Sequence, residues 1–572
     1  MQLKLNAEIS NIQSVRMLIE TALQKDVLNI FLSPGSRNAP LIISFNSVAL
    51  FDCISVVDER TAGFMALGMA QQTKKPVILC CTSGSALLNY APAIAEAYHQ
   101  NIPLIVLAAD RPQEWIGQGE GQSIAQTEVL NGILAHTSKL VGGAAEDDNW
   151  YNRRQVQCAF EIAAEKNRPV LINIPLSEPL YETKTWTIDS ELKQLSFIGQ
   201  QAEVGLEQMS HLKESWSSKE KVMILVGQHQ YSAKLEQQLK LVFEDSRVAI
   251  LTETTANMYH FGFVSCIDRT LEIVNSAEKK SDFIPELLIT IGTNLISKKL
   301  KSFLRNHNAE IIEHWHFGSD MMDTFQTLTH WVKSEPSEII AKLRMLDSEV
   351  VSGFNTAWKG AFFMAEQRHE QYLGEVKYSD LKVFQTILDF VPDKWMMQMG
   401  NSSVVRYVQL FNQLQGVSYF GNRGVSGIEG CTSTAVGAAM KSNANVLCIS
   451  GDHAFRYDAN GLSFENLPDN LKIIVINNDG GNIFRIIEGP QAFKASDEFI
   501  EHTQHKSVKK LVEYHGVDYR AATDLESLEN EMHELVDGSA KSCRVLEVFT
   551  PREVSPQVLK SYFKYISSNS LV

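Results

Sequence analysis

The most constraining feature of the sequence is a pair of short apolar runs that each end abruptly in polar residues. Residues 446–450 are apolar and partly β-branched, as is typical of a buried strand, and a Gly-Asp dipeptide ends the run. Residues 473–476 form a second run, which ends in Asn-Asn-Asp-Gly-Gly at 477–481. We expect a helix over about 458–467 between them, so that the two runs lie as parallel strands in one sheet.

Two such strand ends would bring three oxygen ligands to one point. These ligands are the Asp452 carboxylate, the Asn478 side chain and a main-chain carbonyl at Gly480. Three oxygens, with one carboxylate and without Cys or His, favour a hard cation that also binds phosphates, Mg²⁺ or Mn²⁺. Each segment taken alone is as compatible with an ordinary turn that closes a strand.

The order and spacing of the two segments, with Asp452 and Asn478 26 positions apart, resemble the diphosphate–metal motif of thiamine-diphosphate enzymes. One departure is His453, which stands where many of those enzymes have Gly. Only backbone is expected to approach the phosphates at that position, so the change does not break the motif. The resemblance implies a thiamine diphosphate cofactor bound by Gly451, Asp452, His453, Ala454, Asn478 and Gly480.

Composition limits the size and the partners of the chain. Its 572 residues predict three or four domains, and the formal net charge of −15 argues against nucleic acid or an anionic membrane as partner. Anionic substrates would therefore need local positive charge. The first residues lack a signal pattern, no stretch is apolar enough to span a bilayer, and the eight scattered cysteines read as reduced core residues. These features predict a cytoplasmic protein.

The first third of the chain alternates helix and strand, which is typical of a parallel sheet covered on both faces. Ligands of such a sheet bind at the carboxyl ends of its strands, where Arg37, Glu59 and Arg111 fall. The strands are expected at 28–32, 53–57, 77–81 and 104–108.

Two further α/β units follow a polar, irregular stretch at about 185–220, which predicts a linker. The middle unit lacks a GxGxxG turn, so a dinucleotide there is unsupported. Its strands are expected at 222–226, 248–251, 287–291 and 311–314. The fold class is thus α/β, with three doubly wound, mostly parallel-sheet domains over 1–185, 186–365 (linker and central domain) and 366–572.

Within the thiamine-diphosphate superfamily, the sequence is most similar to the 2-succinyl-5-enolpyruvyl-6-hydroxy-3-cyclohexene-1-carboxylate synthases of menaquinone biosynthesis. The segments that carry this closer resemblance are Ser-Pro-Gly-Ser-Arg (33–37), Asp-Glu-Arg (58–60), Ala-Asp-Arg-Pro (109–112), Gly-Asn-Arg-Gly-Val-Ser-Gly-Ile-Glu-Gly (421–430) and Asn-Asp-Gly-Gly-Asn-Ile-Phe (478–484). The resemblance implies pyrimidine-binding, central and diphosphate-binding domains in that order. It also implies a homodimer or homotetramer with active sites at the subunit interface.

Glu59 is the expected catalytic residue, since in this superfamily a glutamate at the start of that helix hydrogen-bonds the cofactor pyrimidine. A carboxylate there favours the imino tautomer, which can accept the proton of the thiazolium carbon. Ile428 matches the apolar residue that props the cofactor into its bent form. The alternative for Glu59 is an acid that merely complements the helix dipole, and the alternative for Ile428 is an ordinary core residue.

The resemblance also implies the reaction, in which 2-oxoglutarate is decarboxylated and the succinyl group is added to isochorismate. Both substrates are dicarboxylates, so fixed cations are needed, and Arg grips a carboxylate bidentately. Lys299, next to the candidate Lys298, is a further candidate. Each of these Lys and Arg side chains has the alternative of being a solvated surface charge. The residues that match the substrate site are Ser36, Arg37, Arg111, Gln122, Lys298, Ser402, Arg406 and Arg423, with an apolar wall of Ile483, Phe484 and Ile487.

Two other functions remain open at this point. One is a different thiamine-diphosphate decarboxylase or carboligase, such as an acetolactate-synthase-like enzyme, although a small neutral acceptor would not need this many arginines. The other is a non-catalytic nucleotide-binding α/β scaffold. Retention of Glu59 together with Asp452 and Asn478 disfavours the scaffold, because binding alone does not require the glutamate.

Overall fold

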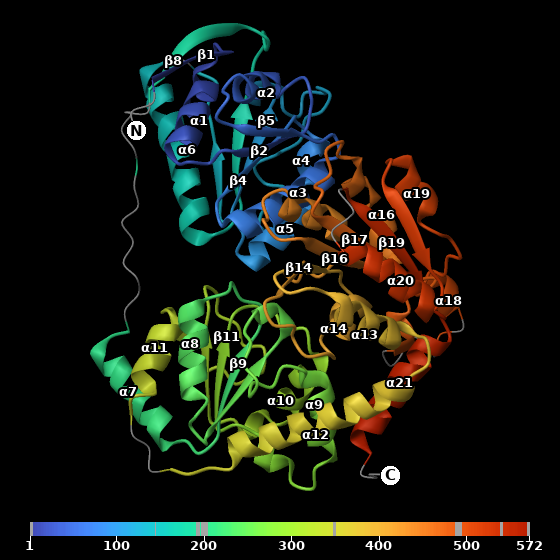
Figure 1. Ribbon diagram of the computed structural model, residues 1–572. Coiled ribbons are helices and arrows are strands. Elements are labelled where there is room, and N and C mark those ends of the chain that lie inside the picture. Colours follow the sequence, from blue (N-terminus) through green and yellow to red (C-terminus); the bar gives the residue numbers. More distant parts are fainter. Residues whose placement is uncertain are drawn as a thin grey trace.

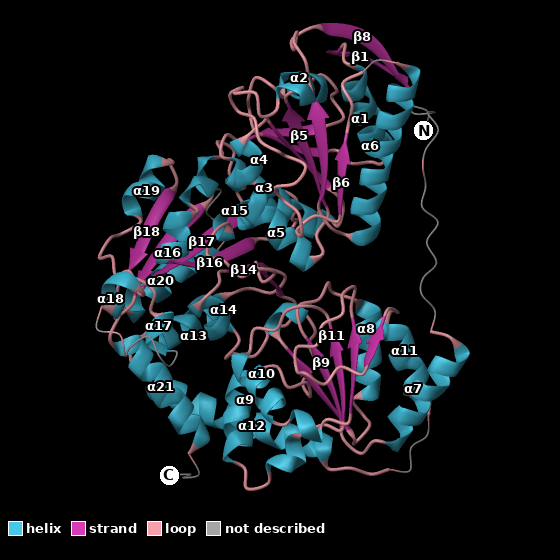
Figure 2. Cartoon of the chain, turned by 180° about the vertical axis from the view of Figure 1, so that it is seen from behind, coloured by secondary structure: helices cyan, strands magenta, loops and turns pink. Residues whose placement is uncertain are grey.

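The computed structural model describes residues 4–143, 145–189, 195, 204–346, 350–486, 493, 495–537 and 542–568. Within these residues, three parallel sheets follow one another along the chain, and helices flank each of them (Figure 1, Figure 2). The predicted α/β class with three mostly parallel sheets is therefore confirmed. All eight cysteines are free thiols, and in the described part of the chain no helix is both long and apolar enough to cross a membrane.

The first sheet has six parallel strands in the order β3-β2-β4-β5-β7-β6. Its interior strands β4 and β5 are buried along their whole length, as expected for a parallel sheet that helices cover on both faces. The strands are β2 Asn29–Leu32, β3 Asp52–Ser55, β4 Val77–Cys81, β5 Leu104–Asp110, β6 His136–Lys139 and β7 Val170–Pro175. The helices are α1 Gln13–Gln24, α2 Ala39–Asn46, α3 Glu59–Thr73, α4 Ser85–Asn89, α5 Ala91–Gln100 and α6 Glu146–Lys166.

An antiparallel ribbon of two strands lies at the outer end of the first domain, beside α1 and α6 (Figure 1). It pairs β1, Lys4–Ser10, with β8, Thr183–Asp189. The expectation that an irregular linker begins at about 185 is therefore wrong for its first residues. The same predicted linker also contains the helix α7, Leu206–Ser218.

The central sheet has five parallel strands in the order β10-β9-β11-β12-β13. The strand expected at 311–314 lies slightly later in the chain, because a short 3₁₀ turn occupies Asn308–Glu310 before it. The strands are β9 Val222–Val226, β10 Val248–Thr252, β11 Leu287–Ile291, β12 Glu313–Phe317 and β13 His330–Val332. The helices are α8 Ala233–Val242, α9 Ile267–Ser276, α10 Lys298–Asn306 and α11 Pro336–Leu343, and α12, Phe354–Glu375, leads to the last domain.

The last sheet has six parallel strands in the order β15-β14-β16-β17-β19-β18. The helix expected at 458–467 is wrong, since α16 begins at the strand end itself and only a 3₁₀ turn, Ala459–Ser463, follows it. The strands are β14 Met396–Met399, β15 Ser418–Gly421, β16 Val446–Gly451, β17 Leu471–Asn477, β18 Asp518–Ala522 and β19 Arg544–Phe549. The helices are α13 Asp380–Phe390, α14 Ser403–Val408, α15 Cys431–Ala439, α16 Asp452–Tyr457, α17 Ile483–Ile486, α18 Ser496–Phe499, α19 Lys509–Tyr514, α20 Leu525–Val536 and α21 Val554–Ser567.

A close crossing of α3 and α15 joins the first and last domains, and it depends on glycine. A Cβ atom at Gly68 would lie 2.0 Å from the carbonyl oxygen of Thr434, and one at Gly437 would lie 1.9 Å from that of Met65. The two helix backbones therefore touch directly, which fixes the position of α3 and of Glu59, its first residue, on the last domain.

Candidate active site

The ends of β16 and β17 form the centre of the candidate site. The two strands are parallel neighbours with Gly451 opposite Ile476, as the apolar runs predict. Asp452 and Asn478 follow these strand ends, and both side chains are buried. A Cβ atom at Gly451 would meet no heavy atom of the described residues within 4 Å, so open space lies over the end of β16. Ala454 is buried in the same short helix as Asp452.

Asp452 is a carboxylate without enough counter-charge. Burial raises its pKa to about 6, although the Arg456 guanidinium opposes the shift, and Asp479 adds to it. Arg456 donates from Nη1 to Asp452 Oδ2 over 2.8 Å, one helical turn away. A cation at the second carboxylate oxygen would supply the charge that the arginine leaves uncompensated.

The Asn478 side chain is held in one orientation by Asp380. Its Nδ2 donates to Asp380 Oδ2 over 3.0 Å, and Asp380 Oδ1 accepts a hydrogen bond from Thr550 Oγ1 over 2.5 Å. The main-chain N–H of Asp380 in turn donates to Ser555 Oγ over 2.9 Å. Because its nitrogen faces Asp380, the oxygen of Asn478 is the atom that remains for a cation.

The turn after β17 requires glycine at 480, where φ is +135°. A Cβ atom there would lie 2.9 Å from the carbonyl oxygen of Glu501. The Gly480 carbonyl accepts a hydrogen bond from the N–H of Asn482 over 2.8 Å and keeps a second lone pair. Asp452, Asn478 and Gly480 thus form an oxygen-only donor set that fits Mg²⁺ or Mn²⁺ with a diphosphate.

His453, at the position where many relatives of the superfamily have Gly, is half-buried. Its ring lies 5.7 Å from the ring of His502, and burial lowers its pKa. Its Nε2 has no hydrogen-bond partner among the described residues. The side chain therefore turns toward the 502 loop.

Glu59 begins α3 and is half-buried, and burial raises its pKa. The neighbouring Asp58 caps the helix by accepting a hydrogen bond from the N–H of Thr61 over 3.2 Å. Asp58 thus supplies the capping hydrogen bond at the start of α3, and Glu59 lies in the first turn, where an acid also complements the helix dipole. Val57, just before them, is 77% exposed.

The buried Arg423 and the half-buried Arg406 form a cationic pair between the central and last domains. Burial lowers the pKa of both, and the charge of Arg406 further lowers the pKa of Arg423. Arg423 Nη1 donates to Asn401 Oδ1 over 2.7 Å, while its buried Nε has no partner among the described residues. Ser402 stands directly before α14 with φ +69°, and its carbonyl oxygen accepts a hydrogen bond from Arg406.

Helix α10 adds further positive charge to this pair. Lys301 is half-buried, and burial lowers its pKa, with Arg423 and the exposed Lys298 contributing. The buried Glu253 is the counter-charge that raises the pKa of Lys301. Lys299, the adjacent candidate, pairs with Glu272, and its Nζ lies 3.3 Å from the centre of the Phe563 ring, so its place in the substrate site stays a prediction.

The four candidates of the first domain lie in loops at the carboxyl edge of its sheet. Arg37 is buried and donates from Nη1 to the Leu176 carbonyl over 2.9 Å, and Arg111 donates from Nη2 to the Gly121 carbonyl over 3.2 Å. Ser36 and Gln122 are exposed. Among the described residues, no hydrogen bond or ion pair joins these four or Glu59 to Asp452, Asn478, Lys298, Ser402, Arg406 or Arg423.

The apolar candidates for the site differ in how exposed their side chains are. Ile428 is 40% exposed in the loop before α15, which leaves its side chain available to a ligand. Ile483 is buried and Phe484 is half-buried, both in α17. Ile487 lies outside the described residues.

Glu96, a residue that the sequence does not single out, holds the loop that carries Arg423 and Ile428. This α5 carboxylate is 2% exposed and accepts main-chain hydrogen bonds from Gly424 over 2.5 Å, Val425 over 2.7 Å and Ser426 over 3.3 Å. A glutamate in an amphipathic helix gives no signal of such a role. The sequence gives no signal for Gln126 either, although its side chain forms hydrogen bonds with the main chain of Gly84 and Ala109 and with the Asn173 side chain.

Comparison with known proteins agrees with this geometry. Residues 13–129 match the N-terminal, and residues 398–548 the C-terminal, thiamine pyrophosphate-binding domain of thiamine pyrophosphate enzymes. The chain is therefore a thiamine-diphosphate enzyme.

Its full-length relatives define the family. The chain is 38% identical to the 2-succinyl-5-enolpyruvyl-6-hydroxy-3-cyclohexene-1-carboxylate synthase of Flavobacterium psychrophilum, over 96% of this chain and 98% of that protein. It is 36% identical to the synthase of Christiangramia forsetii (98% and 100%) and 34% identical to that of Porphyromonas gingivalis (99% and 99%). The chain belongs to the 2-succinyl-5-enolpyruvyl-6-hydroxy-3-cyclohexene-1-carboxylate synthase family.

Proposed function

We propose that the protein decarboxylates 2-oxoglutarate and adds the resulting succinyl group to isochorismate, in menaquinone biosynthesis. The observation that carries this proposal is the cationic pair of the half-buried Arg406 and the buried Arg423, supported by Lys301 and Lys298. Several converging cations in a chain of net charge −15 suit dicarboxylate substrates and not a small neutral acceptor. The family membership of the whole chain supports the same reaction.

The last domain would hold the diphosphate end of the cofactor through Asp452, Asn478 and the Gly480 carbonyl, with one Mg²⁺ or Mn²⁺ ion. Bound thiamine diphosphate supplies a carbon nucleophile and takes up the electron pair that carbon dioxide leaves behind. Asp380 fixes the Asn478 amide, so that the oxygen donors are in place before the metal binds.

Glu59 would take its place at the pyrimidine end and hold a proton on the ring nitrogen that it faces. Burial raises the pKa of Glu59, which favours a carboxyl group that both holds and releases a proton. Arg406 and Arg423 would grip one substrate carboxylate, and Arg37 and Arg111 another. Ile428 would support the cofactor, and Ile483 and Phe484 would exclude water.

The complete site would form between two chains. Glu59 and Asp452 lie in different domains. Within one chain, the start of α3 contacts Asn460 and Tyr457: Asn460 donates a hydrogen bond to Asp58, and Arg60 donates one to the Tyr457 carbonyl. The exposure of Val57 beside Glu59 supports an isologous dimer in which this surface is covered. The domains would be 1–185 for pyrimidine binding, 186–365 as linker and central domain, and 366–572 for diphosphate binding.

Release of carbon dioxide tests the reaction. The protein, with thiamine diphosphate and Mg²⁺, should release labelled carbon dioxide from 1-carboxyl-labelled 2-oxoglutarate much faster than from pyruvate, and isochorismate should accelerate turnover. Faster release from pyruvate would indicate an acetolactate-synthase-like enzyme instead. No cofactor-dependent release from either acid would refute the proposal.

A further inference from the structure

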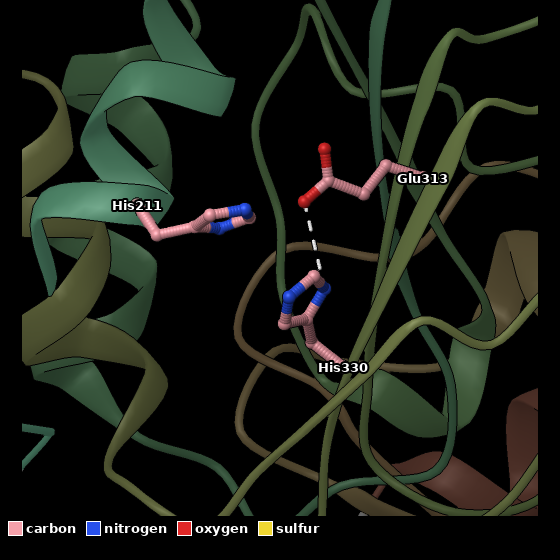
Figure 3. Close-up of side chains that lie close together, drawn as sticks. All are labelled: His211, Glu313 and His330. Atoms are coloured by element: carbon pink, nitrogen blue, oxygen red, sulfur yellow. Dashed lines mark ion pairs between the residues drawn. The ribbon is translucent and has the colours of Figure 1, made fainter. Parts of the chain in front are cut away.

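Three potential metal ligands converge on the central domain, apart from all the residues discussed above. They are His211 on α7, Glu313 at the start of β12 and His330 at the start of β13 (Figure 3). One ligand atom of each side chain lies within 4.8 Å of those of the other two. Figure 3 shows the three side chains around one open space, with Glu313 and His330 joined by an ion pair of 3.5 Å.

The sheet and the helix over it explain why these side chains meet. β12 and β13 are parallel neighbours with His330 opposite Trp315, and Glu313 lies two residues before Trp315 on the same face of the strand. Helix α7 packs through Met209, Leu212 and Trp216 into the core of the central domain. This packing sets the His211 ring 5.2 Å from the ring of His330.

The carboxylate in the cluster is already oriented. Glu313 is buried, its Oε1 accepts a hydrogen bond from Trp315 Nε1 over 2.7 Å, and its Oε2 accepts one from Ser215 Oγ. Lys219 Nζ lies 3.8 Å from Oε2. Each carboxylate oxygen has a further lone pair, and metal-bound carboxylates are commonly held by such outer hydrogen bonds.

We propose that His211, Glu313 and His330 form a binding site for a divalent transition-metal ion of the zinc type. Two imidazoles and one carboxylate suit Zn²⁺, Co²⁺ or Ni²⁺, whereas the oxygen-only set at Asp452 suits Mg²⁺. To close on an ion with bonds of about 2.0–2.2 Å, the ligand atoms must draw together, and the exposed His211 side chain has the freedom to do so. The ion would tie α7 to the edge of the central sheet, with water completing its coordination.

Zinc titration of the cofactor-loaded protein tests the site. Chelator-washed protein, reloaded with thiamine diphosphate and excess Mg²⁺, is titrated calorimetrically with Zn²⁺. We expect one site that His211→Ala and His330→Ala each weaken by more than the roughly 10–100-fold that loss of an outer-sphere partner costs. His307→Ala is the matched control, since His307 is another central-domain histidine beside a glutamate, Glu310, at 2.9 Å, and it should bind Zn²⁺ like the wild type.

Zinc binding that is unchanged in both His211→Ala and His330→Ala would overturn the proposal, as would the lack of any zinc site in the wild type. His211 is exposed, so its replacement should leave the fold intact, and this variant decides alone if His330→Ala does not fold. The absorption spectrum of the Co²⁺-loaded protein gives a second readout. Its bands should report nitrogen and oxygen ligands in the wild type and change in His211→Ala but not in His307→Ala.

Discussion

Glu96→Gln tests how the active-site loop is held. The substitution keeps the size of the side chain but replaces one carboxylate oxygen with an N–H donor. Oε1 accepts hydrogen bonds from the Gly424 N–H and Gln100 Nε2, both at 2.5 Å, and Oε2 accepts from Val425 and Ser426. Each oxygen accepts two hydrogen bonds. Whichever oxygen is replaced, its two donors therefore lose their acceptor and face the NH₂ group of the glutamine.

The magnitude follows from the hydrogen bonds. A bond to a charged acceptor contributes about 1.5–3 kcal/mol, and the 3.3 Å bond from Ser426 contributes less. If the amide oxygen of the variant keeps the two short bonds at Gly424 and Gln100, the variant loses one strong and one weak bond, or about 2–4 kcal/mol. If this whole loss is felt by Arg423, which the loop carries, the transition state is destabilised by the same amount. kcat/KM then falls on the order of 30- to 1000-fold.

The assay is steady-state kinetics with both substrates, combined with thermal unfolding. Glu165→Gln is the matched control, because Glu165 is an exposed helical glutamate of the same domain. We expect Glu96→Gln to lose activity while the protein stays folded at the assay temperature, and Glu165→Gln to behave as wild type. Wild-type kcat and KM in Glu96→Gln would refute the reasoning that this carboxylate positions the loop.

Three further predictions concern the site. Asp452→Asn should abolish calorimetric binding of thiamine diphosphate with Mg²⁺, because the metal loses its one charged ligand, and unchanged affinity would mean that the donor set is misassigned. Arg406→Ala or Arg423→Ala should raise KM for one dicarboxylate by an amount equivalent to about 1.5–3 kcal/mol, and wild-type kinetics in both would contradict the cationic pocket. Inactive Glu59→Gln and inactive Asp452→Asn chains, mixed so that dimers form at random, should regain roughly a quarter of wild-type activity, since one site of each mixed dimer collects both lesions. Background activity in mixed dimers that differential tags confirm would exclude a shared site.

Much of the fold follows from apolar runs alone. β16 and β17 are predictable because buried parallel strands are continuously apolar and consecutive strands commonly lie side by side. The ribbon of β1 and β8 is not predictable in this way, because Thr183–Asp189 is largely polar and pairs with a segment at the other end of the domain. The expected helix at 458–467 is wrong because α16 starts without a separating turn, directly at Asp452.

The candidate site divides in the same way. Asp452 and Asn478 follow from strand ends, whose position the local sequence determines. The roles of Glu96, Gln126 and Lys301 depend on contacts between distant elements, and a single sequence does not show which helix face meets which loop. The ion pair of Lys299 with Glu272 is likewise a contact between two helices that a single sequence does not show.

Carboligation with labelled substrate is the most direct test of the proposed reaction. 2-Oxoglutarate labelled with ¹³C at every carbon is incubated with isochorismate, thiamine diphosphate, Mg²⁺ and the protein, and the products are analysed by mass spectrometry. We predict an adduct that carries every labelled carbon except the carboxyl group released as carbon dioxide, and none with Asp452→Asn. Release of labelled carbon dioxide without any labelled isochorismate adduct would contradict the proposed reaction.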